Sequence, residues 1–253
     1  MKKQNISKKI LNWYDNNKRH LPWREHFSKK QMHYFTLVSE FMLQQTQVKT
    51  VVPYFNNFVK KIPNLRKLAI VSDSKLMKCW EGLGYYSRAR NLKKTAKKIV
   101  SEFNGNLPNK IEELKMLPGI GEYTSRAIMA IAFNQPIIPL DGNVERIIKR
   151  IFYLRNEKEI SKDNIIKKKS FFGKSARSND YAQAIMEIGA LICKPNKPLC
   201  LECPISTNCK SLKKNDFKIK SKNKSSKTKY FEADIYKNRN KYLLIKNNKF
   251  KFL

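Results

Sequence analysis

Acidic residues and long apolar runs are both scarce in this sequence of 253 residues. No apolar run approaches the roughly 20 residues that a membrane-spanning helix needs, and residues 1–17 hold no apolar stretch that could act as a secretory signal. Internal repeats are absent, and strand patterns are scarce before residue 230. We therefore expect neither a membrane protein nor a secreted one, but a folded protein of the cytoplasm.

The shortage of acidic residues gives the chain a strong positive charge. Only 20 Asp and Glu stand against 53 Lys and Arg, a formal net charge of +33, of which residues 210–253 contribute +12 and residues 1–209 the other +21. Hydrophobic residues, at 41%, suffice for a core and exclude a wholly disordered chain. The basic body indicates a polyanionic partner such as nucleic acid, although a general bias toward Lys, Asn and Ile would also inflate the charge.

Apolar residues recur at helical spacing up to about residue 209, separated by turn and cap signals. The pattern predicts an all-α body with about ten helices. Residues 210–229 are rich in Lys, Ser and Asn and are predicted to be a basic linker. Residues 230–253 change to strand periodicity, with two predicted strands on either side of a turn at Asn238–Asn240.

Four of the five cysteines lie within 17 residues, in the spacing C-x6-C-x2-C-x5-C. They are Cys193, Cys200, Cys203 and Cys209. In a reducing compartment such density indicates metal binding rather than disulfides. Structural zinc sites favour paired close knuckles, so the single uneven loop favours a 4Fe-4S cluster over zinc. The fifth, Cys79, is predicted to be a buried apolar thiol.

A second motif, L-P-G-x-G at residues 117–121, lies between two predicted helices. Gly119 and Gly121 permit a tight hairpin, and its free N–H groups at the start of the following helix favour an anion. Such a hairpin can hold one phosphate of a DNA strand. An ordinary helix–helix turn explains the bare pattern as well.

Two carboxylates occur in settings that suit opposite tasks. Glu40 shares a polar helix stripe with Gln44, flanked by apolar residues, so its pKa is predicted to be raised and its proton available for acid catalysis. A solvated helix glutamate is the alternative. Asp141 precedes the helix that starts at about Val144, where it can cap the helix and also remain ionised to stabilise a cation.

Together these motifs resemble the helix-hairpin-helix DNA glycosylase superfamily and, within it, the adenine DNA glycosylases of the MutY type. The resemblance runs almost continuously from Asn12 to Cys209. Besides the hairpin and the cysteine loop, it rests on residues 21–23 (LPW), 39–48 (SEFMLQQTQV), 82–92 (GLGYYSRARNL) and 140–144 (LDGNV).

The resemblance implies a six-helix barrel module at residues 28–133, a 4Fe-4S cluster module built from residues 1–27 and 134–209, and an active site between them. It implies a monomeric enzyme of the bacterial cytoplasm, associated with the nucleoid, that excises adenine mispaired with 8-oxoguanine or guanine in double-stranded DNA. The adenine is flipped out of the duplex. Glu40 would then protonate it at N7, and Asp141 would stabilise the oxocarbenium-like sugar.

The resemblance also assigns the remaining site residues. It places Tyr123 and Asn143 in the catalytic site, Trp23, Arg24 and Gln183 in the adenine pocket, and Gln45, Leu83 and Tyr85 against the opposite base. Endonuclease III, a sister family, has a lysine where this chain has Tyr123, so covalent lyase chemistry is not expected. The cysteines would be the cluster ligands.

The chain departs from the family after the cysteine loop. Residues 230–253 resemble only the first strands of a Nudix-like domain that reads 8-oxoguanine, so the resemblance leaves open whether 8-oxoguanine is preferred over guanine. Two other functions fit the same motifs: an endonuclease III-like glycosylase and lyase acting on oxidised pyrimidines, and a non-catalytic DNA-binding relative.

Overall fold

The computed structural model describes residues 4–25, 28–218, 237–238 and 241–242. It divides into two units, Met1–Ile219 and Lys220–Leu253. The helices of the first unit, with the short 3-10 and π segments labelled η, are α1 Gln4–Asn17, η1 Pro22–Arg24, α2 Lys29–Leu43, α3 Val48–Lys61, α4 Leu65–Ile70, α5 Asp73–Trp80, α6 Ser87–Glu102, α7 Ile111–Lys115, α8 Glu122–Ile131, α9 Gly142–Phe152, α10 Lys162–Lys168, η2 Lys169–Phe172, α11 Ser178–Glu187, η3 Ile188–Ile192, η4 Cys200–Glu202, η5 Ser206–Asn208 and α12 Lys210–Lys213.

The helices begin where short polar side chains can cap them. Ser28 accepts a hydrogen bond from the Gln31 N–H at the start of α2, and Asn64 and Ser72 accept comparable bonds from residues three positions later at the starts of α4 and α5. These bonds satisfy N–H groups that the first turn of a helix leaves free. The all-α body predicted from the sequence is confirmed. No helix among the described residues is long and apolar enough to span a membrane.

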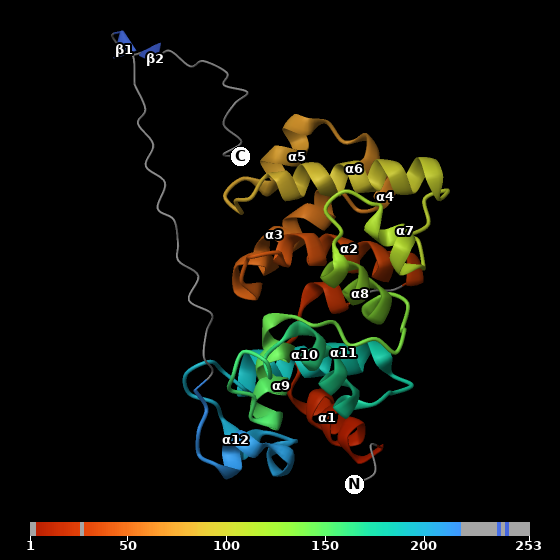
Figure 1. Cartoon of the computed structure of the whole chain (residues 1–253). Coiled ribbons are helices and arrows are strands. Elements are labelled where there is room, and N and C mark those ends of the chain that lie inside the picture. Colours follow the sequence, from red (N-terminus) through yellow and green to blue (C-terminus); the bar gives the residue numbers. More distant parts are fainter. Residues whose placement is uncertain (1–3, 26–27, 219–236, 239–240, 243–253) are drawn as a thin grey trace. The chain divides into compact units, whose positions relative to one another are not determined.

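The buried apolar side chains of the first unit form two separate cores. The first core draws on residues from Leu21 to Ala132, with α2 at its centre, since α2 buries every residue from Tyr34 to Met42. The second core joins α1 to residues 138–205, including the apolar stripe of α9. Figure 1 shows the corresponding division, with α2–α8 in one group and α1 beside α9, α10 and α11 in the other. Leu21 and Trp23 lie in the first core, although the family resemblance assigned residues 1–27 to the cluster module.

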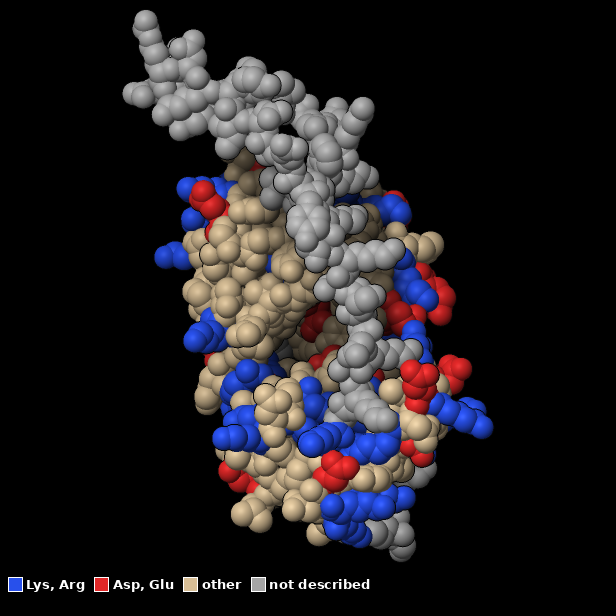
Figure 2. All heavy atoms as spheres, turned by 60° about the vertical axis from the view of Figure 1, so that its left-hand side comes forward, with Lys and Arg blue, Asp and Glu red and all other residues tan. Residues whose placement is uncertain are grey.

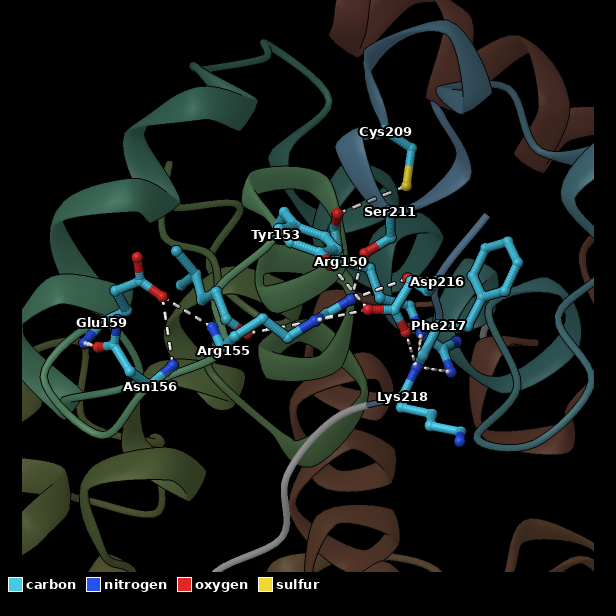
Figure 3. A network of polar contacts seen from close by, with 11 residues as sticks. Arg150, Tyr153, Arg155, Asn156, Glu159, Cys209, Ser211, Asp216, Phe217 and Lys218 are labelled. Carbon is cyan, nitrogen blue, oxygen red and sulfur yellow. Dashed lines mark hydrogen bonds and ion pairs between the residues drawn. The ribbon is translucent and has the colours of Figure 1, made fainter. Parts of the chain in front are cut away.

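The segment after the cysteine loop corrects the predicted start of the linker. Residues 210–218 pack against the body, because α12 contacts α9 and Ser211 is fully buried. Figure 3 shows the polar network that anchors them: Arg155 donates to the Ser211 hydroxyl and to the Asp216 carbonyl, at 3.1 and 2.8 Å, and Tyr153 donates to the Asp216 carboxylate at 2.8 Å. Residues 210–218 are held by polar contacts, so their low apolar content led to the wrong prediction of a linker.

In the second unit the structure describes two short strands. β1 (Lys237–Asn238) and β2 (Lys241–Tyr242) pair antiparallel, with Lys237 opposite Tyr242. Asn238, the first residue of the predicted turn, lies in β1, and the other two turn residues lie outside the described residues. The rest of the predicted strand segment, and residues 219–229 of the predicted linker, lie outside the described residues.

Candidate active site

A pocket of about 950 Å³ lies between the helices of the two cores. Its lining residues come from α1, η1, α2, the start of α3, α8, the start of α9, α11 and η3, so segments distant in sequence meet there. Figure 2 shows a hollow on this face with acidic atoms inside it and Lys and Arg side chains gathered beside and below it. The volume is within the range of pockets that hold a molecule the size of a nucleobase.

Glu40 lies near the end of α2 and faces this pocket. Its residue is 7% exposed, and no hydrogen bond to its carboxyl occurs within the described residues. Burial raises the pKa of Glu40 to about 8, and the charge of Asp141 contributes in the same direction. A carboxyl group without hydrogen-bond donors in a dry site holds its proton at neutral pH. Glu40 is therefore a neutral acid here and not a solvated helix glutamate.

Asp141 faces Glu40 from the start of α9. Its Oδ1 accepts from the Val144 N–H at 2.7 Å and its Oδ2 accepts from the Asn143 amide at 3.0 Å. Burial raises the pKa of Asp141, against the effect of these bonds and of the Arg146 guanidinium, which lower it. Burial is therefore a larger influence on this pKa than the hydrogen bonds at the helix N-terminus. Even so, Asp141 has the donors that Glu40 lacks, and these favour the ionised form.

Tyr123 and Asn143 complete the group around the two carboxyls. Burial, and to a smaller extent the charges of Glu40 and Asp141, raise the pKa of Tyr123 well above its usual range, and its hydroxyl lies 3.7 Å from the Met186 sulfur. Asn143 donates to Asp141 and accepts a 2.7 Å bond from Arg146. Because a guanidinium can only donate, it fixes the Asn143 carbonyl toward itself and the amide N–H toward Asp141.

The other side of the pocket carries a guanidinium pair and an amide. Arg24 donates to the Gln183 carbonyl oxygen at 2.7 Å and to Glu187 at 3.0 Å, while Arg19 binds Glu187 through two nitrogens at 2.9 and 2.7 Å. Trp23 is 9% exposed and lines the same pocket. Burial acts to raise the pKa of Glu187, but the two arginines outweigh it and lower that pKa. The Trp23 ring and the Gln183 amide, which is fixed by Arg24, therefore line the same pocket.

Comparison with known proteins shows the family to which the chain belongs. Residues 38–169, just over half of the chain, match the family described as HhH-GPD superfamily base excision DNA repair protein. An adenine DNA glycosylase of Buchnera aphidicola subsp. Schizaphis graminum is 36% identical over 255 residues, covering 96% of this chain and 70% of that protein. The chain belongs to the adenine DNA glycosylase family of this superfamily.

Other adenine DNA glycosylases extend well beyond the matched region. The adenine DNA glycosylase of Buchnera aphidicola subsp. Baizongia pistaciae is 41% identical over 90% of this chain and 66% of its own length. The mouse adenine DNA glycosylase is 40% identical over 80% of this chain and 41% of its own length. The chain therefore spans less than two thirds of these two relatives.

Solved structures agree on the fold. A thermostable thymine-DNA glycosylase superposes with a TM-score of 0.71 at 25% identity, covering 84% of this chain and 97% of that one. Endonuclease III in a non-covalent DNA complex gives a TM-score of 0.65 at 22% identity, over 85% of this chain and 98% of that one. The helix-hairpin-helix glycosylase fold expected from the sequence is confirmed.

The pocket brings together eight of the residues that the family resemblance singled out. They are Trp23, Arg24, Glu40, Gln45, Tyr123, Asp141, Asn143 and Gln183. Tyr85 lies outside the pocket lining and is 58% exposed. Leu83 differs from expectation: it is 5% exposed and belongs to the first core, so its side chain supports its turn from inside.

The hairpin of the family joins α7 to α8. Gly119 has φ +83°, and a Cβ there would lie 2.8 Å from the Phe41 ring and 3.0 Å from the Asn91 Cβ, so only glycine fits. Gly121 immediately precedes α8, whose first N–H groups face outward at its N-terminus. The geometry suits an anion at this end of α8.

The four cysteines of the loop lie close together. All are free and partly buried, and the pKa of Cys203 is raised to about 12, first by burial and further by the thiols of Cys193, Cys209 and Cys200. Arg150 donates to the Cys193 sulfur at 3.4 Å. Within the described residues no three His, Cys, Asp or Glu side chains are close enough to hold a single metal ion. Cys79, by contrast, is 2% exposed in the first core, as predicted.

Sequence reasoning missed two residues that organise the site. Glu187 lies one turn after Gln183 on α11, and Arg146 lies three residues after Asn143 on α9. Arg146 also donates to the Gly189 and Cys193 carbonyls, both at 2.7 Å. Helical spacing from a known site residue could have suggested both, but their partners lie on other helices and are not visible in the sequence.

The raised pKa of Glu40 predicts how stability changes with pH. Below its unfolded pKa of about 4.5 the group is neutral in both states. Between that value and about 8 only the unfolded state loses the proton, so the folded state becomes less stable as pH rises. We expect the Glu40→Gln variant to lack this loss. Above pH 8 its free energy of unfolding should exceed that of the wild type by on the order of 4 kcal/mol.

Urea denaturation of both proteins at pH 5 and pH 8.5 checks this prediction. The quantity of interest is the difference between the two proteins at each pH, because other titrating groups are common to both. A difference that stays constant between the two pH values would mean that Glu40 has an ordinary pKa.

Proposed function

We propose that this protein is a monofunctional adenine DNA glycosylase that removes adenine mispaired with 8-oxoguanine or guanine in double-stranded DNA. The observation that carries the proposal is the pairing, in one pocket, of a buried protonated Glu40 with an Asp141 carboxylate held by hydrogen bonds. An N-glycosidic bond breaks readily when the leaving base is protonated and the sugar cation is stabilised. The pocket supplies one group for each task.

The reaction begins with an extruded adenine, because a stacked base cannot reach the carboxyls. Glu40 donates its proton to N7, the bond between N9 and C1′ breaks with its electrons passing to the purine, and an oxocarbenium-like sugar remains. Asp141 stabilises this cation electrostatically or through a transient covalent bond. Water then adds at C1′ and its proton returns to a carboxylate. Asn143 holds Asp141 through its hydrogen bond, and Tyr123 lines the site.

Tyr123 also accounts for the proposed monofunctional chemistry. A lyase of the endonuclease III kind needs an amine to attack the sugar, and a phenol cannot form a Schiff base. The pKa of Tyr123 lies well above its usual range, so its oxygen stays protonated and is a poor nucleophile as well.

Purine recognition is assigned to the side of the pocket formed by Trp23, Arg24 and Gln183. The Trp23 ring offers a stacking surface. Since Arg24 donates to the Gln183 carbonyl and the Gln183 amide nitrogen contacts the Asn179 carbonyl at 3.3 Å, one amide N–H remains to bind an acceptor nitrogen of the base. Gln45 and Tyr85, both on exposed turns, are proposed to contact the opposite base.

Duplex DNA would be held largely through its phosphates. The net charge of +33 provides general attraction, and the Gly119–Gly121 hairpin offers a site for one phosphate at the start of α8. We propose that the protein works as a monomer on DNA in the bacterial nucleoid. The two helical modules would take opposite sides of the pocket.

The cysteine loop is proposed to hold a 4Fe-4S cluster. The uneven C-x6-C-x2-C-x5-C spacing suits a larger inorganic core better than zinc, and the thiols of Cys193, Cys209 and Cys200 are close enough to raise the pKa of Cys203. Cys193, Cys200, Cys203 and Cys209 would be its ligands. The cluster would serve as a structural staple that shapes residues 193–209.

Replacing Cys203 by serine tests this assignment. We expect the purified variant to lose most of its iron and acid-labile sulfide, and the visible absorbance that accompanies them, because one thiolate ligand is missing. Cys79→Ser is the matched control, since Cys79 lies in the first core and should leave iron content unchanged. Full iron content in Cys203→Ser, or zinc in the wild type, would contradict the cluster.

The proposed function is tested by single-turnover base release from three duplexes. We expect adenine release from A:8-oxoguanine and A:G duplexes and no release from a thymine-glycol duplex, with strand breaks only after alkali. Release from thymine glycol with strand breaks would favour the endonuclease III-like alternative. Tight binding without release from any of the three would favour a non-catalytic DNA-binding protein.

A further inference from the structure

Arg88 on α6 is a buried arginine with many hydrogen bonds that the proposed mechanism does not use. The residue is 6% exposed. Its Nη1 donates to the carbonyls of Phe41 at 3.3 Å, Met42 at 2.6 Å and Gln44. These three carbonyls belong to the last turn of α2 and its C-cap, where a helix leaves its carbonyl groups without intrahelical partners.

The second guanidinium nitrogen of Arg88 serves a different segment. Its Nη2 donates to the carbonyls of Leu83 at 3.3 Å and Gly84 at 3.1 Å, in the turn between α5 and α6. The same guanidinium lies over the ring of Tyr85, 5.2 Å from its centroid, and 5.6 Å from that of Trp80. One planar group thus joins two chain segments, with one nitrogen for each.

This guanidinium is buried at a cost. No carboxylate pairs with it anywhere in residues 4–25 or 28–218, and its Nε lacks a hydrogen-bond partner. Burial lowers the pKa of Arg88, and only the oxygen of Tyr85 acts in the opposite direction. A buried charge compensated by carbonyl dipoles and aromatic rings, without a carboxylate, is unusual for a group that serves only packing.

The two segments that Arg88 joins each present a strained, exposed residue. Gln45 has φ +56° and Tyr85 has φ +47°, in the left-handed region that residues with a side chain rarely adopt. Gln45 is exposed at the rim of the pocket and Tyr85 is 58% exposed. Strained residues persist where surrounding contacts determine their conformation, and such sites cluster where function needs them.

Helix α6 supports the phosphate hairpin with the same face. Thr95, seven residues after Arg88, donates to the Pro118 carbonyl at 2.8 Å, and Asn91 packs against Gly119. Gln44 donates to the Gly119 carbonyl at 3.2 Å, which connects the end of α2 to the hairpin. Three segments that the proposed function places on DNA therefore rest on one face of α6.

We propose that Arg88 is a positioning residue for mispair recognition: it locks the turn carrying Gln45 and the turn carrying Tyr85 at one fixed separation, so that both side chains enter the duplex together. The locking itself follows from the contacts of Arg88, and its consequence for DNA rests on the proposed function. Lysine cannot replace it, because a single ammonium lacks the two-nitrogen fork that reaches both turns.

The test compares Arg88→Lys with Arg90→Lys, an exposed arginine of the same helix that undergoes the same substitution. Hydrogen–deuterium exchange measures the protection of residues 42–46 and 82–86. Affinity for an A:8-oxoguanine duplex and a fully matched duplex is measured in the Glu40→Gln background, where substrate is not consumed. If Arg88→Lys does not fold, Arg88→Gln takes its place in the test, because removing the buried charge relieves its desolvation cost.

We expect faster exchange at both turns in the Arg88 variant and not in the Arg90 variant. We also expect mispair affinity to fall about tenfold while matched-duplex affinity is unchanged. Wild-type exchange at the turns, or an equal loss of affinity for both duplexes, would overturn the proposal. A wild-type chain that shows no mispair preference would count against the proposed function, and the exchange data would still decide whether Arg88 locks the turns.

Discussion

Replacing Glu40 by glutamine is expected to reduce the single-turnover rate of adenine release by about 10² to 10⁴-fold, the range that a general acid contributes. Glutamine has nearly the shape of a protonated glutamic acid but no transferable proton. Because Glu40 is neutral in the folded protein, the substitution leaves the charge of the pocket unchanged at neutral pH. The measurement is base release from an A:8-oxoguanine duplex under enzyme excess.

Two further measurements make the Glu40→Gln result specific. Duplex affinity should stay within about threefold of the wild type, since no phosphate contact is assigned to Glu40. Glu102→Gln, an exposed position on α6, is the matched control and should keep the full rate. A Glu40→Gln variant that turns over like the wild type would rule out Glu40 as the acid.

Replacing Asp141 by asparagine is expected to lower the same rate by about 10² to 10³-fold, as the loss of a preorganised electrostatic group does. The carboxylate that faces the developing sugar cation disappears, and its hydrogen bonds to the Val144 N–H and the Asn143 amide are met by a single amide oxygen. Stability should change little, because asparagine caps helices about as well as aspartate.

This contrast separates the two roles of Asp141. If it were only the N-cap of α9, the asparagine variant would retain both its stability and its rate. If it stabilises the cation, the rate falls while the free energy of unfolding, measured with urea, is nearly unchanged. A rate near that of the wild type would leave Asp141 as a structural cap and remove one half of the proposed mechanism.

The sequence predicted the site best where a residue's environment is local. Glu40 could be placed in a dry setting because its apolar neighbours lie on the same helix, and Asp141 could be identified as a cap from its position before α9. The hairpin and the cysteine loop are short contiguous motifs. In each case the neighbours that determine the chemistry lie within a few residues along the chain.

The sequence failed where the environment is assembled from distant segments. Burial in a pocket lined by distant segments is the largest influence on the pKa of Asp141, and its position before a helix does not reveal that burial. Glu187 meets Arg19 across 168 residues, and Arg88 meets Phe41 across 47. The residues after Cys209 were wrongly predicted to be a linker. The contacts that hold them are polar and come from Arg150 and Arg155, which lie far away in the sequence.

Carbon-13 NMR titration of the Glu40 side-chain carboxyl, assigned by comparison with Glu40→Gln, tests the central claim most directly. The account predicts that this carbon is in its protonated form at pH 7 and titrates with a pKa of about 8. A Glu40 carboxyl that ionises near its unperturbed value of about 4.5 would contradict it, because no proton would remain for the leaving adenine.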